Sequence, residues 1–338
     1  MPESFDLIAM GRVSMDLFAE QIGSPFEEVE SFSTSVGGSP SNVAIGTSRL
    51  GLNSALVTGV GKDKVGDFVL NYLSKEKVNT NFVNRKEGRT GLAVVGVQPP
   101  ATFPLTFYRE NPADLHVSID DVLAINFQSS KALLISGTGL ARGARRDATF
   151  VAAERAKTDG TKVFIDLDLR PDQWNDPKAY GTSIRAVLPH IDTVIGTEEE
   201  SYAALLENAN DANSTVIKDL SDEQIVQLEQ TLGEKIDQAS FPDIWVLKRG
   251  AKGVSIFSKN AQPVDIQGFK VEIINTVGAG DAFASGFIYS QLKGSSFEDS
   301  AKFANACGAI VVSRHGCSAA MPRLDEVESF LEKQLHSS

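Results

Sequence analysis

The segment 275–281, with the sequence Asn-Thr-Val-Gly-Ala-Gly-Asp, places two glycines and a carboxylate directly before an apolar stretch of helical pattern. Gly278 and Gly280 allow close backbone approach, and the first N–H groups of a helix have no partner within it. Such a helix start binds anions such as phosphate. Asp281 can take the proton of a substrate hydroxyl as its oxygen attacks a phosphoryl group. By spacing alone, a turn with Asp281 as a first-turn charge explains the segment equally well.

The segments that must position this site alternate between short apolar runs and stretches of helical periodicity. The apolar runs predict strands at 7–11, 55–57, 132–135, 163–165, 193–195, 245–247 and 269–273. The periodic stretches predict helices at 41–50, 67–77, 145–158, 221–236 and 324–335. This alternation predicts an α/β fold with a mostly parallel sheet and helices on both faces.

Two stretches, at about 12–36 and 82–109, break the alternation because strand-like pieces follow one another without a helix. They predict a small antiparallel sheet that projects from the main sheet as a lid. We expect residues 1–338 to form a single domain with this lid as a subdomain, and residues 208–219 to form a surface loop.

The charge balance of the 338-residue chain excludes several classes of partner. Lys and Arg number 32 against 44 Asp and Glu, so the formal net charge is −12. This sign is wrong for nucleic acid or an anionic membrane. The N-terminus has no basic signal region, and no apolar stretch approaches the roughly 18 residues of a membrane span, which favours a cytoplasmic protein. Cys307 and Cys317 are too few for a disulfide scaffold and lack metal-site spacing.

A resemblance to a known family assigns the site more closely. Residues 278–283, Gly-Ala-Gly-Asp-Ala-Phe, resemble the signature of the ribokinase-like (PfkB) carbohydrate kinases, and the likeness spans nearly the whole chain. It implies that family's doubly wound sheet with a β lid, and ATP and Mg²⁺ as its cofactors. It also implies that Asp281 is the catalytic base and that Gly278, Ala279 and Gly280 form the cradle for the transferred phosphoryl group.

The sugar side of the resemblance lies near the N-terminus. Asp16 resembles the family's sugar-binding aspartate. The run 36–44, Val-Gly-Gly-Ser-Pro-Ser-Asn-Val-Ala, resembles its Gly-Gly hinge, which includes Gly38, and its sugar-binding asparagine, Asn42. Asn both donates and accepts hydrogen bonds, which suits sugar hydroxyls. A loop or cap role for Asp16 and a packing or cap role for Asn42 are the alternatives.

The nucleotide side of the resemblance lies in the second half of the chain. The run 248–253, Lys-Arg-Gly-Ala-Lys-Gly, is similar to the family's nucleotide loop and implies roles for Lys248, Gly250 and Gly253. Asn305 resembles the family's asparagine near the nucleotide. Ordinary turn positions for the glycines and a helix-surface position for Asn305 are the alternatives.

The metal positions depart in part from the family pattern. Glu199 occupies the glutamate position of the family's Asn-x-x-Glu motif, which implies a place in the Mg²⁺ shell through water, but Gly196 stands where asparagine is usual. An acidic helix start is the alternative for Glu199. Many relatives bind K⁺ through an aspartate and a hydroxyl residue where this chain has Asn275 and Ala320, so K⁺ activation is doubtful.

A narrower resemblance concerns the substrate. Four runs, at 166–171, 195–200, 304–309 and 312–317, resemble the 5-dehydro-2-deoxygluconokinases of myo-inositol breakdown, and the run 108–114 resembles acid-sugar members. The resemblance implies phosphorylation of a sugar acid at its C6 hydroxyl. Arg109 and Arg170 each follow an apparent strand, and a guanidinium pairs bidentately with a carboxylate. Solvated surface charges are the alternative for both arginines.

The sequence is also compatible with other functions. Phosphorylation of 2-dehydro-3-deoxygluconate or fructose is an alternative. The position of the keto group is recognised by the shape of the binding pocket, which the sequence does not give. The run 137–143 suggests an NAD(P)-dependent oxidoreductase, although its spacing is GxGxxxG and not GxGxxG. A non-catalytic sugar sensor is a third alternative. The family resemblance further implies that lid edges can pair in a homodimer. His315 and Cys317 receive no catalytic role.

Overall fold

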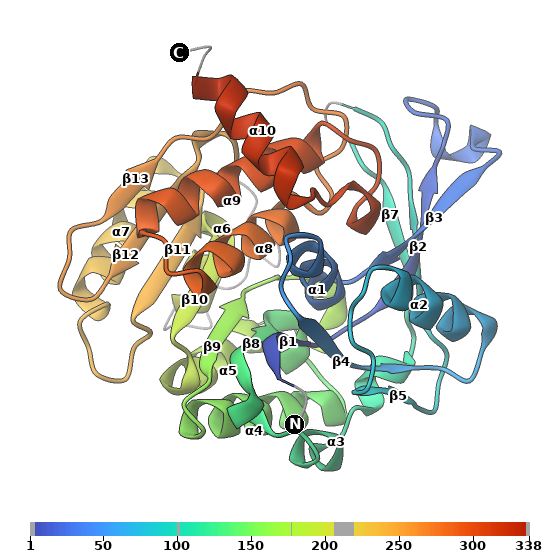
Figure 1. The fold of residues 1–338 in the computed structure, drawn as a ribbon, viewed down its shortest axis with the longest axis horizontal. Coiled ribbons are helices and arrows are strands. Elements are labelled where there is room, and N and C mark those ends of the chain that lie inside the picture. Colours follow the sequence, from blue (N-terminus) through green and yellow to red (C-terminus); the bar gives the residue numbers. More distant parts are fainter. Residues whose placement is uncertain (1–3, 100–101, 177, 206–219, 336–338) are drawn as a thin grey trace. The chain divides into compact units, whose positions relative to one another are not determined.

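The computed structural model describes residues 4–99, 102–176, 178–205 and 220–335 (Figure 1). The chain divides into two compact units, Met1–Val117 with Gly268–Ser338, and Ser118–Gln267. The loop predicted at 208–219 lies outside the described residues. Within the described ranges, no helix is both long enough and apolar enough to cross a membrane.

The first unit contains three parallel strands, β1 (Phe5–Met10), β4 (Ser54–Val60) and β5 (Val83–Arg85). Its helices are α1 (Ser39–Arg49), α2 (Lys64–Lys75), α8 (Ala279–Leu292), α9 (Phe297–Val312) and α10 (Leu324–Leu335). Every residue of β4 is buried, as expected for a parallel strand covered on both faces. Helix α1 packs on β1 and β4, and α8 packs on both α1 and α9 (Figure 1).

A second, smaller sheet in the first unit has the strand order β3-β2-β6-β7. Its strands are β2 (Ser14–Ala19), β3 (Phe32–Gly37), β6 (Gly91–Val95) and β7 (Leu105–Tyr108). The β2–β3 and β6–β7 pairs are antiparallel, but β2 and β6 run parallel. The prediction of a purely antiparallel sheet was therefore wrong, because β6 reaches β2 only after the chain has passed through α1, β4, α2 and β5.

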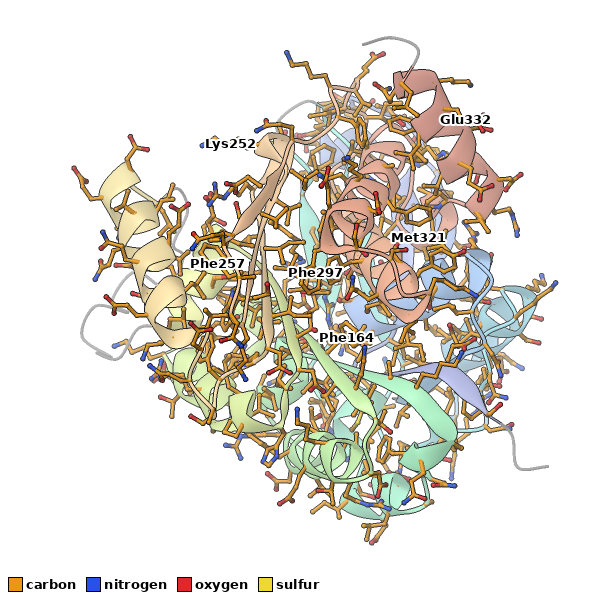
Figure 2. All side chains as sticks on the ribbon, turned by 60° about the vertical axis from the view of Figure 1, so that its left-hand side comes forward. Phe164, Lys252, Phe257, Phe297, Met321 and Glu332 are labelled. Carbon is orange, nitrogen blue, oxygen red and sulfur yellow. The ribbon has the colours of Figure 1, made fainter. Side chains whose placement is uncertain are left out.

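The second unit contains four parallel strands, β8 (Ser130–Ser136), β9 (Lys162–Asp166), β10 (Thr193–Thr197) and β11 (Ile244–Lys248). Antiparallel β12 (Val254–Ser258) and β13 (Val264–Ile266) extend this sheet. The helices are α3 (Ile119–Leu123), α4 (Ala144–Thr158), α5 (Ala179–Val187), α6 (Glu198–Leu205) and α7 (Asp222–Lys235). Phe164 on β9 and Phe257 on β12 belong to the buried core of this unit (Figure 2).

These elements confirm the predicted fold class, an α/β protein with mostly parallel strands flanked by helices and a separate small sheet. One predicted strand, at 269–273, does not form. Phe269 instead packs edge-on against Phe330 of α10, with ring centroids 5.2 Å apart. The N–H groups of Ile274 and Asn275 both donate to the carbonyl of Val312 at the end of α9. The segment is thus anchored to helices, and its backbone has no neighbouring strand.

Candidate active site

The anion cradle predicted at residues 278–281 lies at the start of α8. Gly278 directly precedes the first helical residue and has the left-handed backbone conformation φ 89°, ψ −4°, which glycine adopts without the steric cost of a Cβ. A Cβ at this position would also lie 2.5 Å from the Sγ atom of Cys317. Because the N–H groups of a first helical turn carry the positive end of the helix dipole, this turn is suited to an anion.

Asp281 lies in the first turn of α8 and receives a hydrogen bond from α1. The Nδ2 atom of Asn42 donates to its Oδ2 atom at 2.6 Å, across a sequence separation of 239 residues. The bond forms because α1 packs against α8 (Figure 1). The amide donor and the helix N-terminus both stabilise negative charge on this carboxylate. The structure therefore brings together the residue predicted as base and a residue predicted to bind sugar.

Asp16 on β2 is buried, and its Oδ1 atom accepts a hydrogen bond from the Ser14 hydroxyl at 2.7 Å. Burial raises the pKa of Asp16 to about 6, although the Ser14 hydrogen bond opposes the shift. The positive charges of Arg12 and Arg109 also lower this pKa, and the negative charge of Asp281 raises it. The negative charges of the two carboxylates therefore repel each other, and Asp16 lies in the same region of the first unit as Asp281.

The Gly-Gly hinge joins β3 to α1 and lies against the loop after β1. Gly38 is the residue before α1 and has φ 101°, and a Cβ there would lie 2.5 Å from the carbonyl oxygen of Arg12. A Cβ on Gly37 would overlap the carboxylate of Asp16. Both glycines are therefore steric requirements of this site, and Gly37 sets the position of the Asp16 side chain.

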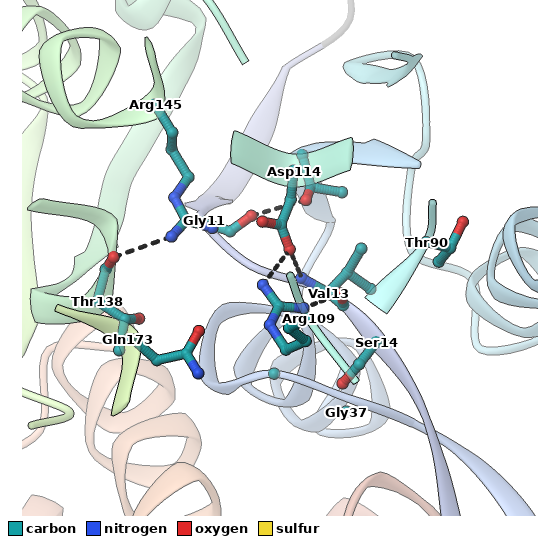
Figure 3. Close-up of polar contacts among 12 residues, drawn as sticks. Gly11, Val13, Ser14, Gly37, Thr90, Arg109, Asp114, Thr138, Arg145 and Gln173 are labelled. Carbon is teal, nitrogen blue, oxygen red and sulfur yellow. Dashed lines mark hydrogen bonds and ion pairs between the residues drawn. The ribbon is translucent and has the colours of Figure 1, made fainter. Parts of the chain in front are cut away.

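Arg109 follows β7 and forms a buried ion pair (Figure 3). Its Nη2 atom donates to Oδ2 of Asp114 at 2.6 Å, and its Nη1 atom donates to the carbonyl of Val13 at 2.9 Å. The N–H of Val13 donates to the same Asp114 oxygen at 3.2 Å. Arg109 thus ties β7 to the loop after β1. Contact of this guanidinium with a substrate carboxylate therefore stays a prediction.

Arg170 lies after β9 in the second unit and is much more exposed. Its side chain is 47% exposed, and its Nε atom lies 3.2 Å from Oδ1 of Asp168. Asp168 is itself buried and accepts a hydrogen bond from the Thr138 hydroxyl at 3.1 Å. The Thr138 carbonyl in turn accepts from Arg145 at 3.0 Å (Figure 3). Asp168, the ion-pair partner of Arg170, is therefore held in the core of the second unit, whereas the Arg170 side chain reaches solvent.

The run predicted as a nucleotide loop forms the turn between β11 and β12. Lys248 ends β11, with its Nζ atom 3.4 Å from Oδ2 of the buried Asp166. Gly250 and Gly253 both have positive φ, 56° and 99°, and Lys252 lies between them in the turn (Figure 2). These residues thus form a tight turn at the end of a strand, and their contact with a nucleotide stays a prediction.

Three glutamates begin α6, and two of them are committed to protein groups. Glu198 lies 3.4 Å from Arg249, and Glu200 accepts hydrogen bonds from the N–H groups of Thr197 and Leu169. Glu199 forms no hydrogen bond or ion pair with the described residues and is half-buried. Its carboxylate fits a water-mediated place beside Mg²⁺. The described residues contain no group of three or more His, Cys, Asp or Glu side chains that could hold a metal directly.

Gly196 on β10, where the family pattern has asparagine, has a steric explanation. A Cβ at this position would overlap the side chain of Leu167. Leu167 follows β9 and is fully buried. A side chain at position 196 would therefore require the buried Leu167 side chain to move.

Asn305 lies on α9, on the face that approaches the anion cradle. Gly308 is three residues further along this helix and therefore lies on the same face. A Cβ on Gly308 would lie 3.5 Å from the carbonyl oxygen of Ala279, the first residue of α8. Asn305 is half-buried. The structure thus places Asn305 about one helical turn from the cradle, and its contact with nucleotide stays a prediction.

Asn275 bridges the cradle segment and the loop after α9. Its side chain is fully buried. The Nδ2 atom donates to the carbonyl of Gly316 at 2.9 Å, and the Oδ1 atom accepts from the N–H of Val277 at 3.0 Å. Each end of the amide is therefore engaged with the backbone, at the position where the family resemblance implies a potassium-binding aspartate.

Two residues without a predicted role lie in this region. Arg12 is buried beside Asp16, and Cys317 is buried against Gly278 and Asn42. Arg12 directly follows Gly11 after the first strand, and nothing in the local sequence pattern marks it as a site residue. Cys317 lies in the run 312–317, whose only signal is its family likeness. Their place at the site depends on contacts between segments that are far apart in the sequence.

The glycines at 137–143 have a packing role in the structure. Gly137–Leu140 form a buried 3₁₀ helix after β8. A Cβ on Gly137 would overlap the carbonyl oxygen of Leu167. This close approach inside the protein accounts for the first glycine, and the geometry gives the oxidoreductase alternative no support.

Comparison with known proteins identifies the family. The model of the pfkB family carbohydrate kinases matches residues 4–324. The 5-dehydro-2-deoxygluconokinase of Halalkalibacterium halodurans is 36% identical over 97% of this chain and 95% of that protein. The 5-dehydro-2-deoxygluconokinase of Shouchella clausii is also 36% identical, over 98% of this chain and 97% of that protein.

A solved structure of similar fold agrees. A fructokinase double mutant from Vibrio cholerae O395, with bound fructose, ADP and potassium ion, is 26% identical, with a TM-score of 0.77 over 97% of this chain and 99% of that one. Sequence, fold and the geometry around Asp281 point the same way. The chain belongs to the pfkB family of carbohydrate kinases.

Proposed function

We propose that this kinase transfers the γ-phosphoryl group of ATP to the C6 hydroxyl of a sugar acid, 5-dehydro-2-deoxy-D-gluconate. The relatives named 5-dehydro-2-deoxygluconokinase, matched over nearly their whole length, support this substrate. The observation that carries the proposal is the position of Asp281 in the first turn of α8, with Asn42 donating to its carboxylate. A base and an anion cradle in one turn are what phosphoryl transfer requires.

In this proposal the first unit binds the sugar acid and performs the proton transfer. Asp281 accepts the proton of the C6 hydroxyl, which becomes the nucleophile. The N–H groups at 278–281 stabilise charge on the phosphoryl group in the transition state. Asp16, Gly38 and Asn42 bind or shape the site for the sugar hydroxyls. Their burial supports this role, because hydrogen bonds are stronger where water is excluded.

The proposal assigns Lys248, Gly250, Gly253 and Asn305 to the nucleotide. Glu199 would hold Mg²⁺ through water, and bound Mg²⁺ supplies charge neutralisation on the β- and γ-phosphates. The ADP in the Vibrio cholerae fructokinase structure supports a nucleotide substrate for this chain. We expect no requirement for K⁺, since each end of the Asn275 amide is engaged with the backbone.

Arg109 and Arg170 are the proposed contacts for the substrate carboxylate. Arg170 is the simpler candidate because its guanidinium reaches solvent, whereas Arg109 is paired with Asp114 inside the protein. The small sheet would act as a lid that excludes water. Leu105 and Tyr108 on its edge strand β7 are exposed, which supports pairing of two lids in a homodimer.

The experiment that tests this function is an ATP-consumption assay of the purified chain with Mg²⁺ and three acceptors. These are 5-dehydro-2-deoxygluconate, 2-dehydro-3-deoxygluconate and fructose. We expect kcat/KM to be highest for 5-dehydro-2-deoxygluconate, with no consumption of NAD(P)H under the same conditions. A higher kcat/KM for either other acceptor would overturn the substrate assignment while leaving the kinase chemistry in place.

A further inference from the structure

The buried side-chain amide of Asn42 has hydrogen-bond partners for its nitrogen but none for its oxygen among the described residues. Its Nδ2 atom donates to Oδ2 of Asp281 at 2.6 Å and contacts Sγ of Cys317 at 3.1 Å. An amide nitrogen carries two N–H groups, so both donors have a partner. The Oδ1 atom is buried and has no hydrogen-bond partner among the described residues. A buried acceptor without a donor destabilises a fold, so we expect a hydrogen-bond donor of a bound ligand to pair with this oxygen.

The orientation of the amide follows from its partners. A flipped amide would place Oδ1 at the same short distance from the Asp281 carboxylate, and two acceptors repel each other. The thiol of Cys317 provides the second partner for the nitrogen. Asp281 and Cys317 together therefore fix the amide with its nitrogen toward them and its oxygen away from them.

The position of Cys317 is itself fixed by neighbours on both sides. Its side chain is 1% exposed, and a Cβ on Gly278 would lie 2.5 Å from its Sγ atom. The adjacent Ser318 hydroxyl donates to the carbonyl of Val36 at 2.5 Å, at the end of β3. Cys317 also belongs to a cluster of buried apolar residues that includes Phe18 and Val95 of the small sheet. The thiol therefore occupies one place between the cradle and the lid strands.

We propose that Cys317 is a positioning residue, which holds the Asn42 amide so that only its oxygen is left for the substrate. This inference rests on the proposed function, in which Asn42 contacts the sugar acid. The group facing Asn42 must then be a hydroxyl, which donates, and a keto oxygen is rejected at that place. On 5-dehydro-2-deoxygluconate, the hydroxyls at C3 and C4 meet this requirement, whereas the C5 keto group does not.

Three variants test the role of the thiol. Cys317→Ala removes the partner of the amide, and we expect KM for the sugar acid to rise about tenfold with KM for ATP unchanged. Cys317→Ser restores an acceptor and is expected to stay within about twofold of the natural enzyme. Cys307→Ala is the matched control, because Cys307 is equally buried and packs on Gly286 of α8, away from the Asn42 amide.

The outcomes separate positioning from packing. If the thiol only fills space, Cys317→Ala and Cys307→Ala will both lower Tm and leave the sugar-acid KM unchanged, which overturns the proposal. A serine variant as impaired as the alanine variant also overturns it. Should another sugar prove to be the substrate, the same three KM ratios apply to that sugar, so failure of the substrate assignment is distinguishable from failure of this inference.

A double-mutant cycle on Tm, without sugar or nucleotide, tests the contact itself. The single variants are Asn42→Ala and Cys317→Ala, and the third protein carries both changes. We expect the Tm loss of the double variant to be smaller than the sum of the two single losses, because both single changes remove the same contact. Additive losses would show that the two side chains are not coupled and would contradict the proposal.

Discussion

The two units hold their candidate residues in different ways. In the first unit, Asp16, Asn42 and Arg109 are all buried and hydrogen-bonded to other protein groups. In the second unit, the Arg170 side chain is 47% exposed, and Glu199 forms no hydrogen bond with the described residues. The first arrangement is set before any ligand binds, whereas the second leaves its side chains adaptable.

This difference matches the tasks in the proposed reaction. Proton transfer and charge stabilisation need groups held in place, since reorganisation during the reaction would raise the barrier. Contacts with the carboxylate or phosphates tolerate more freedom, because they supply binding energy. Substitution of the proposed base or of the buried ion pair in the first unit should therefore lower turnover or stability, and substitution at the exposed Arg170 of the second unit should mainly weaken binding.

The largest expected difference lies between the two arginines. Arg109→Ala leaves the buried Asp114 carboxylate without its ion pair and should lower the free energy of unfolding by about 3–5 kcal/mol. Arg170→Ala, the control at an exposed site, should change it by no more than about 0.5 kcal/mol. We expect it instead to raise KM for the sugar acid about tenfold and to leave KM for fructose unchanged. Urea denaturation and steady-state kinetics measure both, and equal stability of the two variants would contradict this difference between the units.

Removal of the proposed base should act on turnover alone. Asp281→Asn keeps a partner for Asn42 in similar space but cannot accept the hydroxyl proton, so kcat should fall about 100-fold or more, or about 3 kcal/mol in the barrier. The free energy of unfolding should stay close to that of the natural enzyme. Turnover within a few-fold of normal would refute the base assignment.

A methyl group on the hinge should disturb the Asp16 carboxylate. Because a Cβ on Gly37 overlaps that carboxylate, Gly37→Ala should lower kcat/KM for the sugar acid by about 10- to 100-fold. Gly233→Ala is the matched control, since a Cβ on Gly233 of α7 meets no atom within 4 Å. Similar kcat/KM values for the two variants would show that the Asp16 position is not critical.

The raised pKa of Asp16 predicts the smallest effect, a change in the pH dependence of stability. Since its folded-state pKa is about 6 against an ordinary value of 3.8, the folded protein binds more protons than the unfolded chain between these values. The stability contribution is fully present below the lower value and is lost as pH rises through the higher one. Asp16→Asn lacks this loss and should be more stable than the natural enzyme by about 1–3 kcal/mol at pH 7.5. Identical slopes of unfolding free energy against pH for both proteins would contradict the assignment.

The fold was predictable because its signals are local. Alternating apolar runs and helical periods located most of the parallel strands and several of the helices, and the two glycines before Asp281 located the start of α8. The strand predicted at 269–273 failed because Phe269 packs on Phe330 of α10 and the backbone directly after the segment hydrogen-bonds to the end of α9. An apolar run has the same sequence pattern whether it packs on helices or pairs with a strand. The parallel β2–β6 pair was missed because pairing direction depends on a long crossover.

The contacts within the site were not predictable from spacing. Asn42 and Asp281 are 239 residues apart, and nothing in either segment indicates that one donates to the other. Arg109 and Asp114 stand in one short run, yet their ion pair appears only when β7 returns beside the loop after β1. The sequence around Cys317 does not indicate its contact with Asn42, because the two residues are 275 positions apart and meet only in the folded chain. Such contacts come from tertiary structure, whereas residue types come from sequence.

The most direct test of the proposed reaction is the ³¹P NMR spectrum of its product, recorded with proton coupling. The chain is incubated with ATP, Mg²⁺ and 5-dehydro-2-deoxygluconate, and the new phosphorus signal is examined. Transfer to the C6 hydroxyl predicts a triplet from the two protons of the CH₂ group, and no such signal with Asp281→Asn. A doublet from a secondary ester, or inorganic phosphate alone, would contradict the account.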